Sequence, residues 1–307
     1  MEQIDLAIIG SGPAGYTASI YASRYKLNNI VFGKTIGGTI SDAHKVCNYP
    51  GYEEISGFEL GYKIAEQAKK LGGISKQESV EKIERKENGT FEVTTDKETY
   101  QANGVILATG TKRSKLMLPD EDKFLGKGVS YCATCDAMFF KDKIVGVIGG
   151  SDAATTAALL LAETSEKVYI IYRGTELKGD PTWIENVKKD PKIEVIFQTV
   201  VTGLIGEEKL KSVNLSKEFN NEKELILDGL FIEIGSEPNA DLPMKLGLEL
   251  TEKGYIVTKN DQSTSIEGIW AAGDITTNSN GFQQVITACA EGAVAANSAY
   301  CYIKSKC

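Results

Sequence analysis

The chain has 307 residues, a length that favours about two domains, each large enough for its own hydrophobic core. Its formal net charge of -8 argues against general nucleic-acid binding, which calls for a basic face. No apolar run approaches the roughly 18 residues of a membrane span, and the N-terminus carries Glu2 and Asp5 rather than a basic segment, so we expect a cytoplasmic protein that binds neither nucleic acid nor membrane.

The first predicted element is a strand over residues 4–9, followed by a glycine-rich turn and a predicted helix over residues 16–25. The turn reads Gly10-Ser11-Gly12-Pro13-Ala14-Gly15, the GxGxxG spacing in the strand, turn and helix setting that a dinucleotide site requires. Gly10 allows the tight turn, Gly12 lets backbone approach a pyrophosphate, and Gly15 lets helix and strand pack closely.

The next predicted strand, residues 29–32, ends at Gly33-Lys34 without the acidic residue that often holds an adenosine ribose. That absence weakens the prediction of an ordinary NAD-binding site here. Turn-rich segments at residues 37–39 and 48–51 are expected to be surface loops. Residues 58–71 have helical spacing, and residues 91–95 and 104–108 are predicted strands.

The central motif is Cys132-Ala133-Thr134-Cys135-Asp136. Two thiols separated by two residues can close a small-ring disulfide, and the spacer permits the turn and helix start that lower a thiol pKa. The alternative, a structural zinc half-site, requires a second pair of Cys or His ligands at ligand spacing. Because His44 is the only histidine and the other cysteines are scattered, we predict a reversible redox pair and no metal site.

A second copy of the opening pattern follows the redox motif. A predicted strand over residues 144–148 leads into Gly149-Gly150-Ser151-Asp152-Ala153-Ala154, which suggests a flavin domain plus a nicotinamide domain. The copy is imperfect, because Ser151 stands where Gly12 stands in the first turn. The next strand, residues 167–172, ends in Tyr172-Arg173-Gly174, and one Arg does not decide between a phosphate ligand and a solvated side chain.

The last part of the chain completes the predicted fold. Residues 193–197, 213–215 and 225–233 are predicted to be antiparallel or edge strands, and residues 235–243 a return linker. Asp274 follows a short predicted strand, and an Ala-rich helix follows it over residues 283–302. The small residues of that helix permit close approach to backbone or to a cofactor, and a tightly packed core helix is equally compatible.

Together these residues resemble the low-molecular-weight thioredoxin reductases over nearly the whole chain. The resemblance implies an α/β fold of two Rossmann-like FAD/NAD(P)-binding-type domains, each a three-layer ββα arrangement, the first of them discontinuous. It implies an FAD-binding domain over residues 1–113 and 242–307 and a CxxC-bearing NAD(P)-like domain over residues 114–241, with tightly held FAD, thioredoxin as substrate and a homodimer. The motifs that carry it are GSGPAG from Gly10, NYPG from Asn48, ATG from Ala108, CATCD from Cys132 and GIWAAGD from Gly268.

The resemblance also implies roles for individual residues. Cys135 would lie against the flavin and accept its electrons, Cys132 would attack the substrate disulfide, and Asp136 would act as the acid/base. A carboxylate beside a flavin and a thiolate can have a raised pKa, and a helix-capping role for Asp136 is the alternative. The implied FAD contacts follow strand ends and open the last helix: Gly10, Ser11, Gly12, Pro13, Ala14, Gly15, Gly33, Lys34, Gly38, Thr39, Asn48, Val80, Ala108, Thr109, Gly110, Gly273, Asp274, Gln283, Gln284 and Val285.

The departures from the family pattern concern the electron donor. NADPH-linked members carry a GxGxxA turn and an HRRxxxR run, where this chain has Gly149-Gly150-Ser151 and YRGTELK from Tyr172. On the flavin side, Thr39 replaces a usual Gln and Gln283 a usual Arg. This combination resembles the ferredoxin-dependent flavin thioredoxin reductases, which keep FAD and the CxxC motif but take electrons from reduced ferredoxin.

The energetics of that donor are favourable. Ferredoxin delivers single electrons, and a flavin can pass them on as a pair. A donor at about -400 mV and thioredoxin at about -270 mV differ by about 130 mV, or roughly 6 kcal/mol for two electrons. Because ferredoxins are commonly acidic, docking calls for a basic patch, for which Lys112, Arg113 and Lys115 are the candidates.

Three other interpretations stay open at this point. The first is a thioredoxin reductase that uses NADPH or NADH through an atypical site, with Arg173 and Lys178 holding a phosphate. The second is a family member with another low-potential carrier as donor. The third is a non-enzymatic flavin-binding redox sensor, which the intact CATCD motif disfavours. Cys301 and Cys307 are expected to be incidental thiols.

Overall fold

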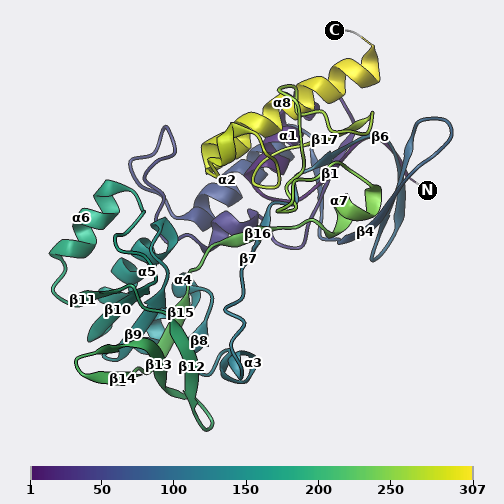
Figure 1. Ribbon diagram of the computed structural model, residues 1–307. Coiled ribbons are helices and arrows are strands. Elements are labelled where there is room, and N and C mark those ends of the chain that lie inside the picture. Colours follow the sequence, from purple (N-terminus) through teal and green to yellow (C-terminus); the bar gives the residue numbers. More distant parts are fainter. Residues whose placement is uncertain (1, 306–307) are drawn as a thin grey trace. The chain divides into compact units, whose positions relative to one another are not determined.

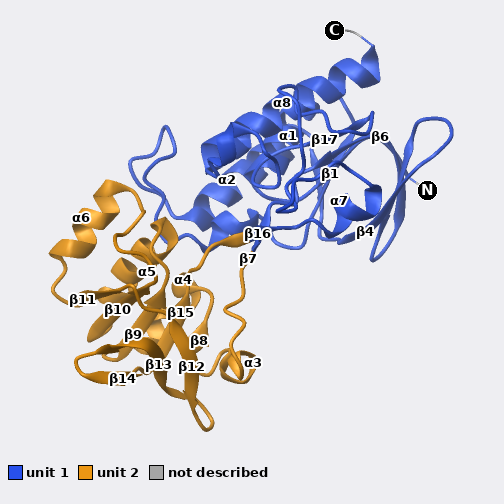
Figure 2. Ribbon diagram, in the orientation of Figure 1, with its two compact units in different colours: residues 1–112, 237–307 blue, residues 113–236 orange. Residues whose placement is uncertain are grey.

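The computed structural model describes residues 2–305 and divides into two compact units, which Figure 2 colours separately. Unit 1 comprises residues 1–112 and 237–307, and unit 2 comprises residues 113–236. Unit 1 therefore joins the two ends of the chain, as the expected discontinuous first domain requires. The unit boundaries fall after residues 112 and 236, compared with the positions 113 and 241 expected from the sequence.

Unit 1 is built on a seven-stranded sheet with the order β3-β2-β1-β6-β5-β4, to which β17 adds by pairing with β6. The strands β1, β2, β3, β6 and β17 are parallel, and β4, β5 and β6 form an antiparallel arm. The strands are β1 (Glu2–Ile9), β2 (Asn29–Phe32), β3 (Ile74–Lys76), β4 (Val80–Arg85), β5 (Phe91–Thr95), β6 (Thr99–Leu107) and β17 (Ile269–Ala271).

The sheet of unit 1 has a separate hydrophobic core on each face. Successive residues of β1 alternate between the two, so that Leu6 and Ile8 pack with the helices while Ala7 and Ile9 pack with the antiparallel arm. The helix α8 lies along α1, as Figure 1 shows for the yellow and purple helices. The helical elements are α1 (Pro13–Arg24), η1 (Gly38–Asp42), α2 (Gly57–Lys70), α7 (Asp241–Leu246), η3 (Ser279–Gly281) and α8 (Val285–Lys304).

Unit 2 repeats the layered arrangement with a five-stranded parallel sheet of order β11-β10-β9-β15-β8. One face packs on α5, and the other packs on a three-stranded antiparallel sheet, β12-β13-β14. Its strands are β8 (Val129–Ser130), β9 (Ile144–Ile148), β10 (Lys167–Tyr172), β11 (Ile193–Phe197), β12 (Val201–Gly206), β13 (Leu210–Phe219), β14 (Glu222–Ile226) and β15 (Gly229–Ile232); its helices are α3 (Glu121–Phe124), α4 (Ala133–Asp136), η2 (Ala137–Phe140), α5 (Asp152–Ala162) and α6 (Pro181–Lys189).

These layers confirm the predicted α/β class with two Rossmann-like domains, but one local prediction was wrong. The segment 225–233 is not one edge strand, because it ends β14 and then forms β15, which lies inside the parallel sheet between β9 and β8. The segment 193–197 forms β11, an edge strand as predicted, and it pairs with β10 in parallel. The segment 235–243 carries the chain from unit 2 back to unit 1, as the predicted return linker requires, and it contains β16 (Ser236–Pro238), which pairs with β7 (Thr111–Arg113).

No helix within residues 2–305 combines the length and the apolar character needed to cross a membrane.

Candidate functional site

The carboxyl edge of the unit 1 sheet is where most of the predicted cofactor residues gather. The strand β1 pairs with β2 on one side and with β6, which comes much later in the chain, on the other. The order of the strands therefore reverses direction at β1. In open α/β sheets, that reversal creates a crevice at the carboxyl ends of the strands. The segments that follow β1, β2, β6 and β17 all carry predicted FAD contacts.

The glycine turn after β1 has the geometry that a dinucleotide needs. Gly10 has φ +122°, and a Cβ on it would lie 2.0 Å from the carbonyl oxygen of Ala108. A Cβ on Gly12 would meet nothing nearer than the Gly37 oxygen at 3.8 Å, so the space beside Gly12 is open. Gly12 is also the N-cap of α1 and brings no side chain to that helix end. An open cradle at a helix N-terminus suits the pyrophosphate of FAD.

Close contacts join this turn to the other predicted FAD segments. A Cβ on Gly38 would lie 3.1 Å from the Gly12 Cα, and a Cβ on Gly273 would lie 2.9 Å from the Ala14 Cβ. The amide of Asn48 donates a hydrogen bond of 3.0 Å to the side chain of Gln284. The structure thus brings η1, the Asn48 loop, the end of β17 and the start of α8 to one place, all within unit 1.

The remaining predicted FAD residues extend this arrangement. Ser11 lies against Gly33, where a Cβ would meet the serine hydroxyl at 2.2 Å. The side chain of Gln283 donates a hydrogen bond of 3.1 Å to the Asp274 carbonyl. Val80 opens β4 and is half-buried. The expected surface loop at residues 37–39 continues into η1, which borders the glycine turn.

Asp274 is the acidic group of this crevice. Burial, together with the smaller effect of the negative charge of Glu291, raises its pKa from 3.8 to about 6. Among the described residues, none donates a hydrogen bond to the Asp274 carboxylate. The carboxylate is therefore available to a donor group of a bound cofactor.

The raised pKa of Asp274 predicts an unusual dependence of stability on pH. Because the folded pKa lies above the unfolded value, this residue favours the folded state below pH 4, and that contribution is lost as the pH rises through about 6. We expect flavin-free Asp274→Asn protein to be more stable than the parent at pH 8, by up to about 3 kcal/mol, with a smaller difference at pH 5. Thermal unfolding of both proteins at the two pH values measures this.

The control for that experiment is Asp142→Asn, which changes an exposed aspartate in unit 2. Its effect on stability should be small at both pH values. A difference between Asp274→Asn and parent that stays the same from pH 5 to pH 8 would contradict the assigned ionisation.

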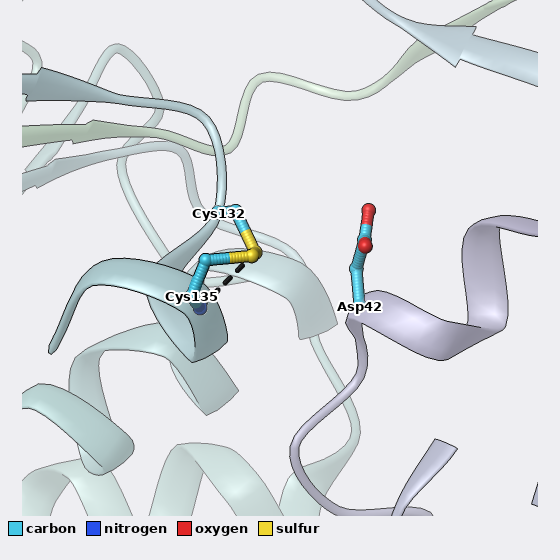
Figure 3. A group of neighbouring side chains, drawn as sticks. All are labelled: Asp42, Cys132 and Cys135. Atoms are coloured by element: carbon cyan, nitrogen blue, oxygen red, sulfur yellow. Dashed lines mark hydrogen bonds between the residues drawn. A yellow bond between two sulfur atoms is a disulfide. The ribbon is translucent and has the colours of Figure 1, made fainter. Parts of the chain in front are cut away.

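The redox motif lies in unit 2, where the short helix α4 follows β8. Cys132 and Cys135 form a disulfide with Cα atoms 5.3 Å apart, and the Cys135 N–H donates a hydrogen bond of 3.2 Å to the Cys132 sulfur, as Figure 3 shows. Cys132 is half-buried and Cys135 is exposed. The sequence expectation of a CxxC disulfide therefore agrees with the observed bond.

Asp136 follows the disulfide and is held by a residue that the sequence analysis did not single out. The Ser130 hydroxyl donates a hydrogen bond of 2.6 Å to the Asp136 carboxylate, and it accepts one of 3.0 Å from the Cys132 N–H. Asp136 stands at the N-cap of η2 but makes no side-chain capping bond there. This arrangement disfavours the helix-cap alternative and leaves the carboxylate fixed beside the redox pair.

The other cysteines differ in state. Cys47 is an exposed free thiol and Cys289 is a buried one. Cys301, in α8, is disulfide-bonded, so its interpretation as an incidental thiol was wrong. Cys307 lies outside the described residues.

The second glycine turn, in unit 2, contrasts with the first. A Cβ on Gly150 would lie 2.6 Å from atoms of the Tyr172 ring, and a Cβ on Gly174 would lie 2.5 Å from the same ring. The N–H of Lys178 donates a hydrogen bond of 2.7 Å to the Gly150 oxygen. The ring of Tyr172 therefore packs on Gly150, the residue between the positions that match Gly10 and Gly12, much as Gly33 packs on Ser11 in the first turn. At the position of Gly12 stands Ser151, and a Cβ on Gly179 would lie 3.3 Å from its carbonyl carbon, so the segment around Gly179 borders the end of α5 where a pyrophosphate would bind.

The predicted basic patch is weaker than the sequence suggested. The Arg113 guanidinium forms a 2.7 Å ion pair with Glu233, which is only 7% exposed. Lys115 lies 3.3 Å from Asp122. Two of the three charges in the proposed patch are thus already paired within unit 2.

The chain is similar to known proteins over almost its whole length. Residues 4–292 match the family described as pyridine nucleotide-disulphide oxidoreductase. A thioredoxin reductase of Treponema pallidum is 41% identical over 302 residues, which cover 97% of each chain. The thioredoxin reductase of Lactococcus lactis is 34% identical, with a TM-score of 0.93 and coverage of 98% of this chain and 99% of that one. A ferredoxin-flavin thioredoxin reductase of Clostridium acetobutylicum is 35% identical over the whole of both chains, with a TM-score of 0.54.

Proposed function

Because the chain belongs to the pyridine nucleotide-disulphide oxidoreductase family, in which FAD is the cofactor, we propose that it is a thioredoxin reductase whose electron donor is reduced ferredoxin. Two features support the reductase activity. The first is the Cys132–Cys135 disulfide, and the second is the similarity to thioredoxin reductases over almost the whole chain.

The surface beside the disulfide suits a protein substrate. Met138 and Phe139 lie in η2, which follows α4 directly, and are 71% and 73% exposed. Exposed apolar side chains next to a reactive group are typical of a docking surface for a protein partner. This position supports thioredoxin as the substrate that reaches the cysteine pair.

The proposed cycle balances electrons and protons at the two cysteines. FAD, when bound, accepts single electrons and passes them on as a pair. The Cys132–Cys135 disulfide takes two electrons and two protons, and Asp136 is placed to exchange a proton with Cys132. The Cys132 thiolate then attacks the thioredoxin disulfide to form a mixed disulfide. Attack by Cys135 on the Cys132 sulfur releases reduced thioredoxin and restores the starting bond.

The observation that carries the donor assignment is Ser151 at the position of Gly12, with the segment around Gly179 packed against it. An NADPH-linked enzyme needs an open glycine turn in its second unit, whereas here a serine stands at the second glycine position and a Cβ on Gly179 would lie 3.3 Å from the carbonyl carbon of that serine. A donor that gives electrons without binding as a dinucleotide is consistent with this arrangement. The similarity to the ferredoxin-flavin thioredoxin reductase supports the same choice.

The alternative donor is NADPH or NADH. The name of the matching family refers to pyridine nucleotides, and the Treponema relative is named simply as a thioredoxin reductase. Under this alternative, the segment around Gly179 would have to move away from Ser151. We favour ferredoxin because the ordinary phosphate-binding residues are also replaced.

Anaerobic reduction of the purified flavoprotein tests the donor. We expect photoreduced ferredoxin to bleach the flavin absorbance and to generate thioredoxin thiols, while NADPH and NADH leave the spectrum unchanged over the same time. Two electrons should enter for each thioredoxin disulfide reduced. Rapid bleaching by NADPH, coupled to thiol formation, would instead establish the nucleotide-linked alternative.

The oligomeric state and the cellular localisation are predictions that rest on the resemblance to the thioredoxin reductases. We propose that the chain forms a homodimer and acts in the cytoplasm. The roles assigned above to individual FAD contacts are likewise part of this proposal.

A further inference from the structure

Glu291 is a buried carboxylate with no place in the motifs of the sequence. It lies in α8 and is 6% exposed. The Gly273 N–H donates to its Oε2 at 2.8 Å and the Thr276 hydroxyl at 2.9 Å, while the Ser279 hydroxyl donates to its Oε1 at 2.5 Å. A buried carboxylate is costly unless it is hydrogen-bonded. All three donors belong to the loop between β17 and α8, so Glu291 fixes that loop at three points.

The same stretch of α8 lies against the glycine turn. A Cβ on Gly292 would lie 2.2 Å from the Ala14 carbonyl oxygen, so the helix backbone is in direct contact with the turn. Gly273 in turn packs on the Ala14 side chain. The loop that carries Asp274 and the turn that carries Gly12 come from opposite ends of the chain, and this part of α8 touches both.

We propose that Glu291 is a positioning residue of the FAD site, which holds the loop from Gly273 to Ser279 in place against the glycine turn. The inference rests on the FAD site assigned above and is independent of the electron donor. Glu291 acts through this loop and through Asp274 rather than by touching substrate. The negative charge of Glu291 has a second consequence. Among the described residues, Glu291 is the charged group that raises the pKa of Asp274 and so opposes its ionisation.

Titration of FAD into the flavin-free, full-length protein tests the positioning role. We expect Glu291→Ala to raise the dissociation constant of FAD at least about tenfold, measured by quenching of flavin fluorescence. Glu121→Ala is the matched control, because Glu121 is also 6% exposed and hydrogen-bonded but lies in unit 2. An unchanged dissociation constant for Glu291→Ala would overturn the proposal.

Glu291→Gln separates position from charge. A glutamine can accept from Gly273 and Thr276 through its oxygen and donate to Ser279 through its nitrogen, so FAD affinity at pH 8 should stay within about threefold of the parent. The pH at which FAD affinity changes should move to a lower value, because the charge that opposes ionisation of Asp274 is gone. A purely structural role would leave that pH unchanged.

The two variants together keep the proposal decidable. If Glu291→Ala fails to fold, the pH profile of Glu291→Gln decides, and an unmoved midpoint overturns the inference. The titration uses neither an electron donor nor thioredoxin. A wrong assignment of ferredoxin would therefore leave this result untouched.

Discussion

A Cys135→Ser variant is expected to bind FAD normally and to lose thioredoxin reduction by about three orders of magnitude or more. The reason is that Cys132 keeps its thiol and can attack the substrate disulfide, but no second thiol remains to resolve the product. Incubation with oxidised thioredoxin after reduction of the variant should therefore trap a covalent one-to-one adduct. Mass spectrometry of the intact adduct measures the expected bond between Cys132 and thioredoxin.

The reverse variant identifies which cysteine attacks. Cys132→Ser should lose turnover equally but form little adduct, because Cys135 is expected to face the flavin side of the reaction. Cys47→Ser, which changes an exposed free thiol, should retain turnover and is the control. Equal adduct formation by both single variants would mean that the two roles are not separated as proposed.

Replacement of Gly12 by valine should abolish FAD binding while the protein stays folded. Gly12 has φ -87° and open space beside it, so a side chain fits the fold but fills the cradle for the pyrophosphate. We expect at least about a hundredfold weaker FAD binding, or roughly 3 kcal/mol. Flavin content after purification and titration of the flavin-free protein measure the loss, and circular dichroism checks the fold.

Ser151→Val is the matched control, because Ser151 holds the same position in the second turn and has extended backbone at the N-cap of α5. This variant should keep its FAD. Gly15→Ala is a different case, since a Cβ there would lie 1.9 Å from the Gly10 oxygen and should destabilise the fold itself. Full flavin content in Gly12→Val protein would place the pyrophosphate elsewhere.

The parts of the fold that sequence predicts well are those with local signals. The strands at 144–148 and 167–172 match β9 and β10 to the residue, because each is a short apolar run bounded by a polar or glycine-rich segment. The prediction for 225–233 was wrong because apolar residues lie on both sides of the corner at Leu227 and Asp228. The two strands β14 and β15 therefore look like one long apolar strand in the sequence. Only the pairing of β15 with β9 distinguishes the two strands.

The same distinction applies to the sites. Glycine spacing and the CxxC motif are local patterns, so the turn at Gly10 and the disulfide could be predicted from the sequence. The bonds of Glu291 reach residues up to 18 positions away, and its acidic side chain in an Ala-rich helix was the one available sign. The covering of Gly150 by Tyr172 depends on packing between a strand end and a turn, which no spacing rule describes.

The discontinuity of unit 1 has a consequence for biosynthesis. A ribosome makes the glycine turn near residue 12 before unit 2 and the loop around Asp274 after it. At roughly 5–20 residues per second, these two halves of the crevice emerge on the order of tens of seconds apart. Unit 2 is continuous and is complete well before its neighbour. The nascent chain therefore acquires its redox disulfide region before the second half of the crevice, and capture of the cofactor has to wait until unit 2 has been made.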